Sequence, residues 1–256
     1  MKKTLKECII VTGASGKIGS YMSSYLLRNG YDVLGISRKS QKIIKYGSNP
    51  TDNSYGDFYE LNVDLTSSNI ASILSAKIED LRLKPVGLIN NARNVENLSL
   101  NADGSTARIN FEAEHLLNVV IPYEISLEIY NKFLSLRSIV NIGSIYGSVA
   151  MNHNLYTDKY ASAPIHYGVS KAALIHLTKE LSVRFSTRKV AVNCLSFGGI
   201  RGREDTAFEN RYAQLCPNNE MLTEGDVLHH IKYLIHPDFS GMTGQNLIVD
   251  GGWTVW

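Results

Sequence analysis

Cysteine is scarce in this 256-residue chain, and its three cysteines are not spaced as metal ligands. Cys8 and Cys194 fall in apolar runs that read as strands, where a free cysteine behaves as a small buried hydrophobe. Cys216 stands apart from both. The sequence therefore predicts no metal site, and the free thiols fit a reducing cytoplasm.

Long apolar runs and an excess of one charge are also absent. No run reaches the ~18 apolar residues that cross a bilayer, and no apolar segment of signal-peptide length follows the lysines of residues 2–6. The 26 basic residues against 24 acidic ones leave a net charge of +2, which favours neither nucleic acid nor a membrane surface as a partner. We expect a soluble cytoplasmic protein.

The chain shows no internal repeat, low-complexity tract or linker. Short apolar runs alternate with helical patterns, at residues 8–11, 32–37, 58–63, 86–89, 139–142, 190–195 and 246–249. Strands that alternate with helices form a parallel sheet covered on both faces. The pattern predicts an α/β fold with a doubly wound parallel sheet of about seven strands, in a single domain over residues 1–256.

A glycine-rich turn follows the first of these runs. Its spacing, Gly13-x-x-Gly16-x-x-Gly19, lies between a strand-like segment and a helical pattern over residues 20–28. Such a turn lets the backbone approach a pyrophosphate and points a helix N-terminus at it. The spacing differs from the usual dinucleotide fingerprint, and an ordinary tight turn is the alternative. Its place directly after an N-terminal strand favours nucleotide binding.

Tyr167 and Lys171 lie four residues apart in a second helical pattern. Residues at this spacing share one helical face, and an ammonium beside a phenol favours the ionised form of the phenol. The pair suits general acid-base chemistry near neutral pH. Taken alone, it also fits a surface helix with a half-buried tyrosine.

Together the two motifs resemble the short-chain dehydrogenase/reductase family, and further segments follow in that family's order. Asn90-Asn91-Ala92 matches the family's Asn-Asn-Ala-Gly element, except that Arg93 replaces the glycine. Asn110 matches its helix asparagine, and Ser144, at the end of a strand-like run, matches its catalytic serine.

The C-terminal half continues the resemblance. Residues 192–200 resemble the strand and turn after the catalytic helix, with Phe197 in place of the usual proline. Residues 243–252 resemble the closing strand. The resemblance covers residues 8–252 and implies a Rossmann-like fold.

The resemblance also implies catalytic roles. Tyr167 would exchange the proton of the substrate hydroxyl while a nicotinamide exchanges the hydride, and Ser144 would hydrogen-bond the reacting oxygen. Lys171 would hold the nicotinamide ribose and favour the phenolate, and Asn110 would support a water-linked proton route to Lys171. Strand-end capping and a hydrogen bond within the helix are the alternatives for Ser144 and Asn110.

A dinucleotide cofactor is implied as well. Its contacts would be Gly13, Ser15, Gly16, Lys17, Ile18, Gly19, Ser37, Arg38, Asp64, Leu65, Asn91, Ala92, Tyr167, Lys171 and Ile200. An acidic residue after the second strand would bind a ribose 2′-hydroxyl, whereas Ser37-Arg38-Lys39 suits a 2′-phosphate, with Lys17 as a second cation. NADP(H) is favoured and NAD(H) is possible, because Arg38 could instead stack on adenine or solvate the strand end.

Two segments bear on the substrate. Residues 145–166 are longer than in most family members, and the surplus, 151–165, is polar and aromatic, which suits a hydroxyl-rich ligand. An expected lid, residues 200–222, adds arginines that could dock an anionic group. The candidate substrate contacts are Arg93, Tyr146, Tyr156, Tyr160, Arg201 and Arg203. The alternative is that the insert forms a subunit contact.

These segments look similar to those of short-chain dehydrogenases associated with bacterial flagellin and surface-polysaccharide sugar modification, including nonulosonate pathways. The resemblance implies an NADP(H)-dependent oxidoreductase that interconverts a hydroxyl and a ketone on an activated or acidic sugar in bacterial glycan biosynthesis. We expect a homodimer or homotetramer. A 3-oxoacyl-type or other ketone reductase, a nucleotide-sugar epimerase or dehydratase, and a non-catalytic NADP-binding sensor remain open.

Overall fold

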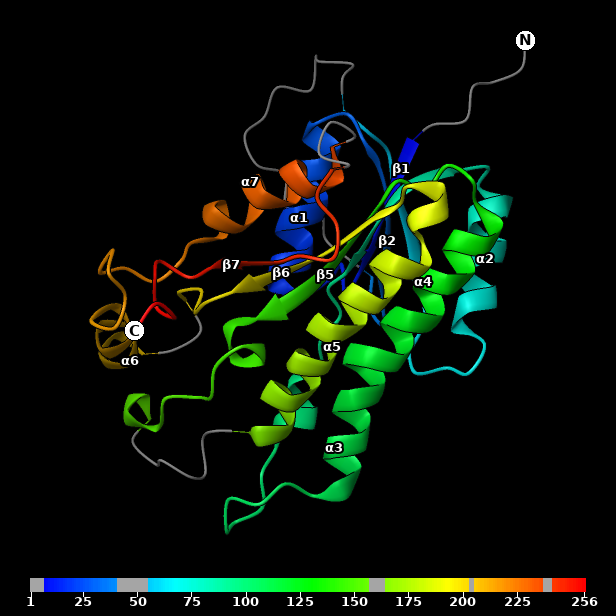
Figure 1. Ribbon diagram of the computed structural model, residues 1–256. Helices are drawn as coiled ribbons and strands as arrows, with labels where there is room; N and C mark the ends of the chain where they lie inside the picture. The colour runs from blue at the N-terminus through cyan, green and yellow to red at the C-terminus, as the bar shows by residue number, and fades with distance from the viewer. Residues whose placement is uncertain (1–6, 41–54, 157–163, 203–204, 237–240) are drawn as a thin grey trace.

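One parallel sheet runs through the computed structural model, which describes residues 7–40, 55–156, 164–202, 205–236 and 241–256 (Figure 1). The strand order is β3-β2-β1-β4-β5-β6-β7. The strands are β1 (Glu7–Thr12), β2 (Asp32–Ser37), β3 (Phe58–Asn62), β4 (Lys84–Asn90), β5 (Ser138–Ser144), β6 (Ala191–Phe197) and β7 (Asn246–Val249). The predicted doubly wound sheet is confirmed.

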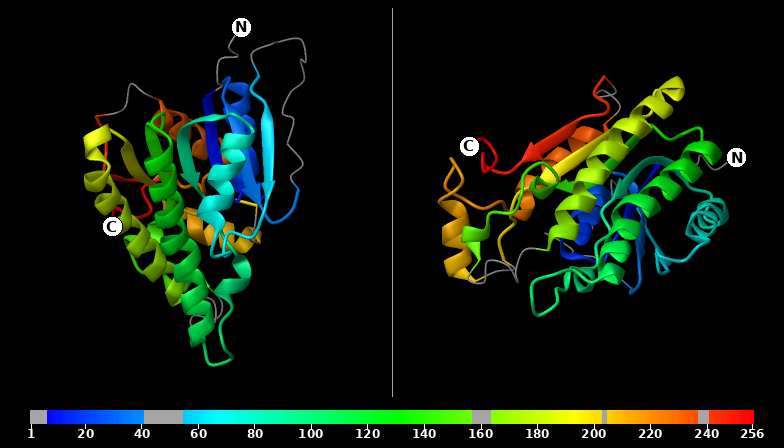
Figure 2. Two further views of the ribbon diagram at one scale, coloured as in Figure 1. Left: turned by 90° about the vertical axis from the view of Figure 1, so that its right-hand side faces the viewer. Right: turned by 60° about the horizontal axis from the view of Figure 1, so that its bottom comes forward.

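Helices cover both faces of this sheet. They are α1 (Lys17–Arg28), α2 (Ile70–Asp80), α3 (Arg108–His115), α4 (Ile121–Lys132), α5 (Ile165–Arg184), α6 (Thr206–Ala213) and α7 (Glu224–Ile235). Helix α1 packs with α7, α2 packs with α4, and α3 packs with α5. The views in Figure 2 show α2, α4 and α5 lying side by side over one face.

Strand β1 shows why both faces are covered. Cys8 and Ile10 belong to the apolar cluster under α2, α4 and α5, whereas Ile9 and Val11 belong to the cluster under α1 and α7. Successive side chains of a strand point to opposite faces. A continuous apolar run in a strand therefore requires a helical layer on each side.

The segments predicted to be functional lie at the carboxyl ends of the strands. Strand order reverses between β1 and β4, and the connections that follow these two strands diverge there. Strand β5 ends at Ser144, as the strand-like run over residues 139–144 predicted, and β6 runs to Phe197, beyond the predicted 190–195. Ser144 pairs with Phe197, and this pairing carries Ser144 to the edge of the sheet.

Helices α3 and α4 are continuous through a wide turn at Leu116–Val120, where the backbone forms a π-helical segment. Such a segment is rare and is frequently found at functional sites.

The predicted insert and lid pack together. Leu155 and Tyr156, from the described part of the insert, join Tyr212 and Met221 of the 200–222 segment in a third apolar cluster around Trp253. Residues 157–163 of the insert lie outside the described residues. The two segments thus form one wall beyond the end of β5.

Candidate active site

A large cavity opens along the carboxyl ends of the strands, with a volume of about 1020 Å³. Pockets for drug-sized ligands span roughly 300–1,000 Å³, so this cavity has room for a large ligand. It brings together the residues that the sequence predicted to contact the cofactor, namely Gly13, Ser15, Gly16, Lys17, Ile18, Gly19, Ser37, Arg38, Asp64, Leu65, Asn91, Ala92, Tyr167, Lys171 and Ile200.

The glycine turn fits closely against the end of β4. Gly13 has a φ of 66°, and a Cβ on it would lie 2.7 Å from the Cα of Ala92. A Cβ on Gly19 would lie 2.2 Å from the backbone oxygen of Gly13. The backbone N–H groups of Asn91 and Ala92 both donate to the Thr12 hydroxyl oxygen. The bare backbone of this turn can therefore approach a ligand closely.

The N-terminus of α1 is chemically suited to an anion. Its first residue is Lys17, its N-cap residue Gly16 supplies no side-chain acceptor, and its first turn has no acidic residue. The first N–H groups of the helix and the positive end of its dipole therefore stay available. A pyrophosphate fits this position.

Lys17 does not serve as the expected second cation for a 2′-phosphate. Its ammonium forms an ion pair with Glu224 at 2.7 Å and donates to the backbone oxygen of Arg201 at 2.8 Å. The hydrogen bond from Lys17 is the main reason why the pKa of Glu224 lies below its usual value. Lys17 instead ties the glycine turn to the segment that precedes α7.

The end of β2 supplies other cations. Arg38 and Lys39 are exposed and line the cavity. The Ser37 hydroxyl donates to the backbone oxygen of Lys39 at 2.6 Å and so fixes the turn. Opposite them, the backbone N–H and the hydroxyl of Thr66 donate to Asp64 and hold the pKa of that carboxyl below its usual value, with a smaller contribution from Arg38.

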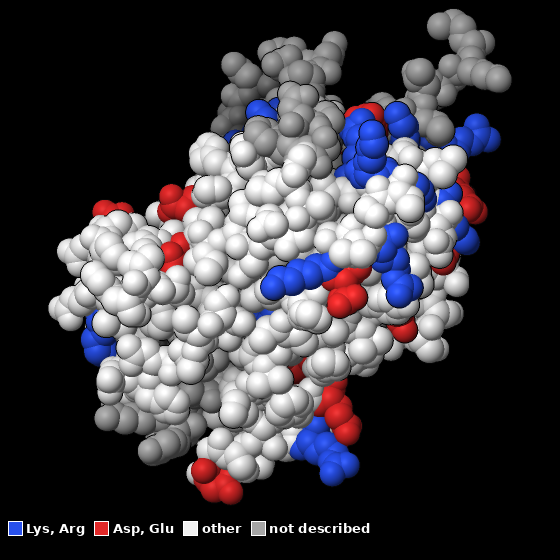
Figure 3. Space-filling model, viewed as in Figure 1, with Lys and Arg blue, Asp and Glu red and all other residues white. Residues whose placement is uncertain are grey.

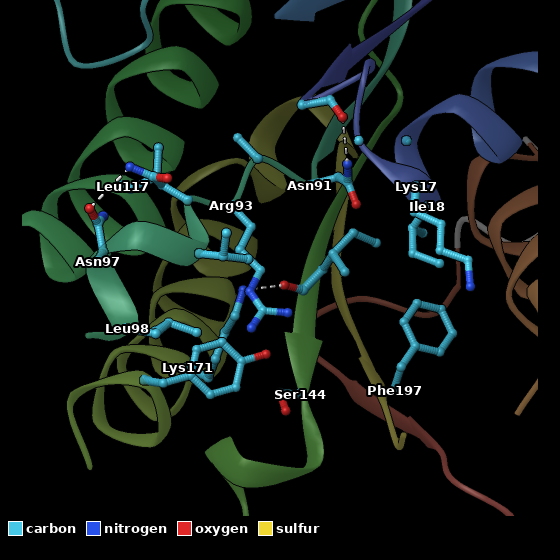
Figure 4. A pocket seen from close by; sticks show the side chains of 18 of the residues that line it. Lys17, Ile18, Asn91, Arg93, Asn97, Leu98, Leu117, Ser144, Lys171 and Phe197 are labelled. Atoms are coloured by element: carbon cyan, nitrogen blue, oxygen red, sulfur yellow. Dashed lines mark hydrogen bonds between the residues drawn. The ribbon is translucent and has the colours of Figure 1, made fainter. Parts of the chain in front are cut away.

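Ser144, Tyr167 and Lys171 meet in another part of the cavity. Ser144 ends β5, and its hydroxyl oxygen accepts the backbone N–H of Tyr146 at 3.3 Å. Lys171 is buried, and its Nζ donates to the backbone oxygen of Ile142 at 2.8 Å and lies 5.8 Å from the centre of the Tyr167 ring. Figure 4 shows Ser144 and Lys171 directed toward the same part of the cavity.

Two glycines set the distance between these groups. A Cβ on Gly147 would lie 2.8 Å from the backbone carbon of Lys171, and a Cβ on Gly168 would lie 2.9 Å from the backbone oxygen of Tyr146. The short 3-10 turn after Ser144 (Ile145–Gly147) therefore rests directly on α5. These backbone contacts hold the turn after Ser144 against the helix that carries Tyr167 and Lys171.

Arg93 occupies the place of the family's usual glycine and reaches into the cavity (Figure 4). The carbon of its guanidinium lies 5.1 Å from the centre of the Tyr167 ring. Within the described chain, no hydrogen bond or ion pair holds this guanidinium. Arg93 thus places a positive charge beside the reacting groups.

The structure does not place Asn110 with the catalytic residues. Its Nδ2 donates to the backbone oxygen of Ser99 at 2.9 Å, and its side chain is absent from the cavity wall. Asn118, two turns further along the same helix, lines a small second cavity together with Lys171. The sequence match failed because a resemblance of short segments does not fix the helical register relative to α5.

Aromatic rings form the wall contributed by the insert and the lid. Tyr146 and Tyr156, two of the predicted substrate contacts, line it, and Phe208 and Tyr212 of the lid add two rings that were not among those predicted contacts. The ring centres of Tyr156 and Phe208 are 5.6 Å apart, and those of Tyr146 and Trp253 are 6.0 Å apart. Burial raises the pKa of Tyr146 and of Tyr212, so both hydroxyls stay protonated at neutral pH.

The lid arginines take other positions than expected. Arg201 does not line the cavity, and one of its terminal nitrogens lies 3.5 Å from the backbone oxygen of Met221. Arg211 donates to the backbone oxygen of Leu155 and thereby joins the lid to the insert. Tyr160 and Arg203 lie outside the described residues.

No cluster of potential metal ligands occurs among the residues that the structure describes. No helix in that part of the chain is long and apolar enough to span a membrane.

A dinucleotide-type turn and an acid-base pair at the carboxyl edge of such a sheet are the arrangement of an oxidoreductase. The family model described as enoyl-(acyl carrier protein) reductase matches residues 13–254. The chain belongs to the short-chain dehydrogenase/reductase family.

Three curated relatives align with nearly the whole chain. An uncharacterized short-chain type dehydrogenase/reductase of Sinorhizobium fredii is 28% identical over 96% of this chain, which spans only 43% of that relative. The post-translational flagellin modification protein A of Campylobacter coli is 25% identical, with 96% of this chain and 98% of the relative covered. The 3-oxoacyl-[acyl-carrier-protein] reductase of Rickettsia bellii is 25% identical, with 96% of each covered.

Solved structures share the fold. A short-chain dehydrogenase of Leptospira borgpetersenii with bound NAD+ has a TM-score of 0.82 and 24% identity, with 98% of this chain and 93% of that chain covered. The structure of ElxO with bound NADP has a TM-score of 0.79 and 24% identity, with 98% and 100% covered.

Replacing Tyr167 by Phe should abolish turnover and leave cofactor affinity unchanged. Only the transferable proton is removed, and a positioned acid-base group contributes roughly 10²–10⁴-fold to rate. Fluorescence titration with NADPH and NADH, beside a turnover assay, checks both parts. A variant that keeps more than about a tenth of the wild-type rate would contradict the role of Tyr167.

Replacing Gly168 by Ala should lower kcat, because the new Cβ would lie 2.9 Å from the Tyr146 backbone oxygen and push the serine turn away from α5. Gly225→Ala in α7 is the matched control, since its Cβ would meet only Thr223 Oγ1 at 3.5 Å, an ordinary contact. Both substitutions raise helix propensity by about 1 kcal/mol. Equal rates in the two variants would remove Gly168 from this positioning role.

Proposed function

We propose that the protein interconverts a hydroxyl and a ketone with NADP(H) as cofactor. The observation that carries this proposal is the meeting of Ser144, Tyr167 and Lys171 in the cavity that the glycine turn also lines. The uncapped N-terminus of α1 and the bare turn at Gly13 fit a pyrophosphate. A bound nicotinamide would supply the hydride.

The residues of the chain handle the proton. The Ser144 oxygen already accepts the Tyr146 N–H, so its own proton is available to a substrate oxygen. Tyr167 donates to the same oxygen during reduction and accepts its proton during oxidation. Lys171 spends one N–H on Ile142 and has two more. One of these can bind a cofactor ribose, and the ammonium charge favours the ionised form of the nearby phenol.

The preference for NADP(H) rests on the end of β2. Arg38 and Lys39 line the cavity there, and the residues from Ile36 to Lys39 include no carboxylate. A guanidinium matches a phosphate in shape and charge. Proteins of the same fold have been solved with NAD+ and with NADP, so the argument depends on this chain's own residues.

We further propose an acidic sugar as substrate. Tyr146, Tyr156 and Tyr212 line this part of the cavity with aromatic rings, which suit the apolar ring faces of a sugar. Arg93 offers a charge to an anionic group. The similarity to a flagellin modification protein supports this choice. More specifically, we propose that this substrate is a sugar of bacterial glycan synthesis.

A 3-oxoacyl substrate is the second candidate. Met151, Met221 and Phe208 line the same part of the cavity and would suit an acyl chain. The similarity to a 3-oxoacyl reductase supports it. Neutral acyl ketones would not need Arg93, which separates the two candidates.

We also propose a homo-oligomer, either a dimer or a tetramer. Ile165, Val169 and Val183 on α5 and Ile109 on α3 are exposed apolar residues. Figure 3 shows mostly uncharged side chains over the lower centre of the face seen in Figure 1, where the N-terminal half of α5 lies. Size-exclusion chromatography with light scattering tests this, and a monomer at micromolar concentration would contradict it.

Arg38→Asp should reverse the cofactor preference, because it replaces attraction of a 2′-phosphate by repulsion. Fluorescence titration should show weaker NADPH binding with NADH binding retained. Arg108→Asp makes the same change of charge on an exposed residue outside the cavity and serves as the control. Tighter binding of NADH than NADPH by the wild type would overturn the cofactor assignment.

Arg93→Met should weaken binding of an acidic sugar by about 1.5–3 kcal/mol, the range for a hydrogen bond to a charged group. The loss should shrink as salt rises, because exposed charges are screened over ~8–10 Å. The measurement is KM for acidic sugars, neutral sugars and 3-oxoacyl thioesters in wild type and variant. Turnover of acyl ketones only, unaffected by this substitution, would favour the second candidate.

A further inference from the structure

Glu114, in the last turn of α3, is a carboxyl group that is wholly inaccessible to solvent. Its Oε1 accepts a hydrogen bond from Asn118 Nδ2 at 2.6 Å, and its Oε2 meets no donor within the described chain. A polar group buried without full pairing is costly. It lies outside the wall of the large cavity, so it does not touch a ligand there.

The contact with Glu114 fixes how the Asn118 amide is turned. Asn118 Nδ2 also donates to the backbone oxygen of Glu114 at 3.0 Å. An amide nitrogen has two hydrogens, so Glu114 receives both of them. The other end of the amide, Oδ1, is left as an acceptor that points away from Glu114.

Asn118 is close to Lys171. It lies in the π-helical segment Leu116–Val120, and it lines a cavity of about 10 Å³ whose polar residues are Thr12, Asn90, Asn118 and Lys171. That size is at the lower limit for one water. Lys171 forms part of the walls of both cavities, so this residue separates the cavity that holds Ser144 and Tyr167 from the one that Asn118 lines.

We propose that Glu114 is a positioning residue that turns the Asn118 amide oxygen toward Lys171. The ammonium is then held from two sides, by the backbone oxygen of Ile142 and, through one water in the small cavity, by Asn118 Oδ1. Its remaining N–H is left for the cofactor ribose. The inference rests on the proposed function, because it assumes that Lys171 takes part in that reaction. The contacts of Lys171 can be tested without a turnover assay.

Glu114→Met and Glu114→Gln form the test pair. Methionine has nearly the shape of glutamate but no acceptor for Asn118, which frees the amide to turn. Glutamine keeps one acceptor oxygen and should preserve the amide orientation. The two variants therefore separate orientation of Asn118 from the charge of Glu114.

The probe is the rate at which an acetylating reagent modifies Lys171, followed by mass spectrometry from pH 7 to 10. Lys179, exposed on the same helix, is the internal control. Glu114→Met should raise the Lys171 rate about tenfold or more relative to Lys179, the factor that loss of one hydrogen bond to a charged group implies. Glu114→Gln should behave as wild type. The NADPH affinities measured by titration should likewise set Glu114→Met apart from Glu114→Gln and wild type.

Several outcomes would overturn the inference. An unchanged Lys171 rate in Glu114→Met, or an equal rise in both variants, would show that orientation of the amide is not what Glu114 supplies. Asn118→Leu should reproduce the effect, and adding Glu114→Met to it should cause no further rise. If Glu114→Met does not fold, Glu114→Gln and Asn118→Leu still give opposite expected results. Failure of every tested ketone to react would instead count against the proposed function.

Discussion

The close contact between the ends of β1 and β4 is the constraint on which the site depends. The Thr12 hydroxyl receives two backbone N–H groups from Asn91 and Ala92, and the glycine turn packs against them with no side chain between. This contact sets where α1 begins and where Arg93 leaves the sheet. One contact between two strand ends thereby positions both the N-terminus of α1 and the positive charge of Arg93 beside Tyr167.

The cavity has walls of two kinds. The wall made by β1, β4, β5 and α5 is held by backbone contacts and buried hydrogen bonds, such as those of Asn90 with Asn141 and of Asn141 with Thr178. The wall made by the insert and the lid is held by aromatic packing around Trp253. The serine, tyrosine and lysine that match the family lie on the first wall, and the aromatic residues proposed to contact the substrate lie on the second.

Much of this could be predicted from the sequence. The alternation of apolar runs predicted the sheet, since a buried parallel strand leaves a continuous apolar signal. The residues predicted to contact a cofactor follow these strands directly in the sequence. Contacts between segments distant in sequence could not be predicted. The ion pair of Lys17 with Glu224 and the packing of Tyr212 depend on how the lid folds back, and periodicity does not report this.

The predicted catalytic asparagine is another case in which a contact between distant segments could not be predicted. Asn110 and Asn118 lie on one continuous helix, and only the position of that helix against α5 decides which of them approaches Lys171. The π-helical segment shifts the register between them. No propensity or spacing in the sequence marks such a shift.

The close contacts of Gly147 and Gly168 with the neighbouring backbone affect how the sequence of the protein can diverge in evolution. Because main-chain atoms set the spacing of Ser144 and Tyr167, side chains of the insert and lid can be exchanged without moving the two hydroxyls. New ligand preferences can then be acquired one substitution at a time while the chemical step is preserved. Engineering of selectivity should begin at Tyr156 and Phe208, whose changes leave that spacing untouched.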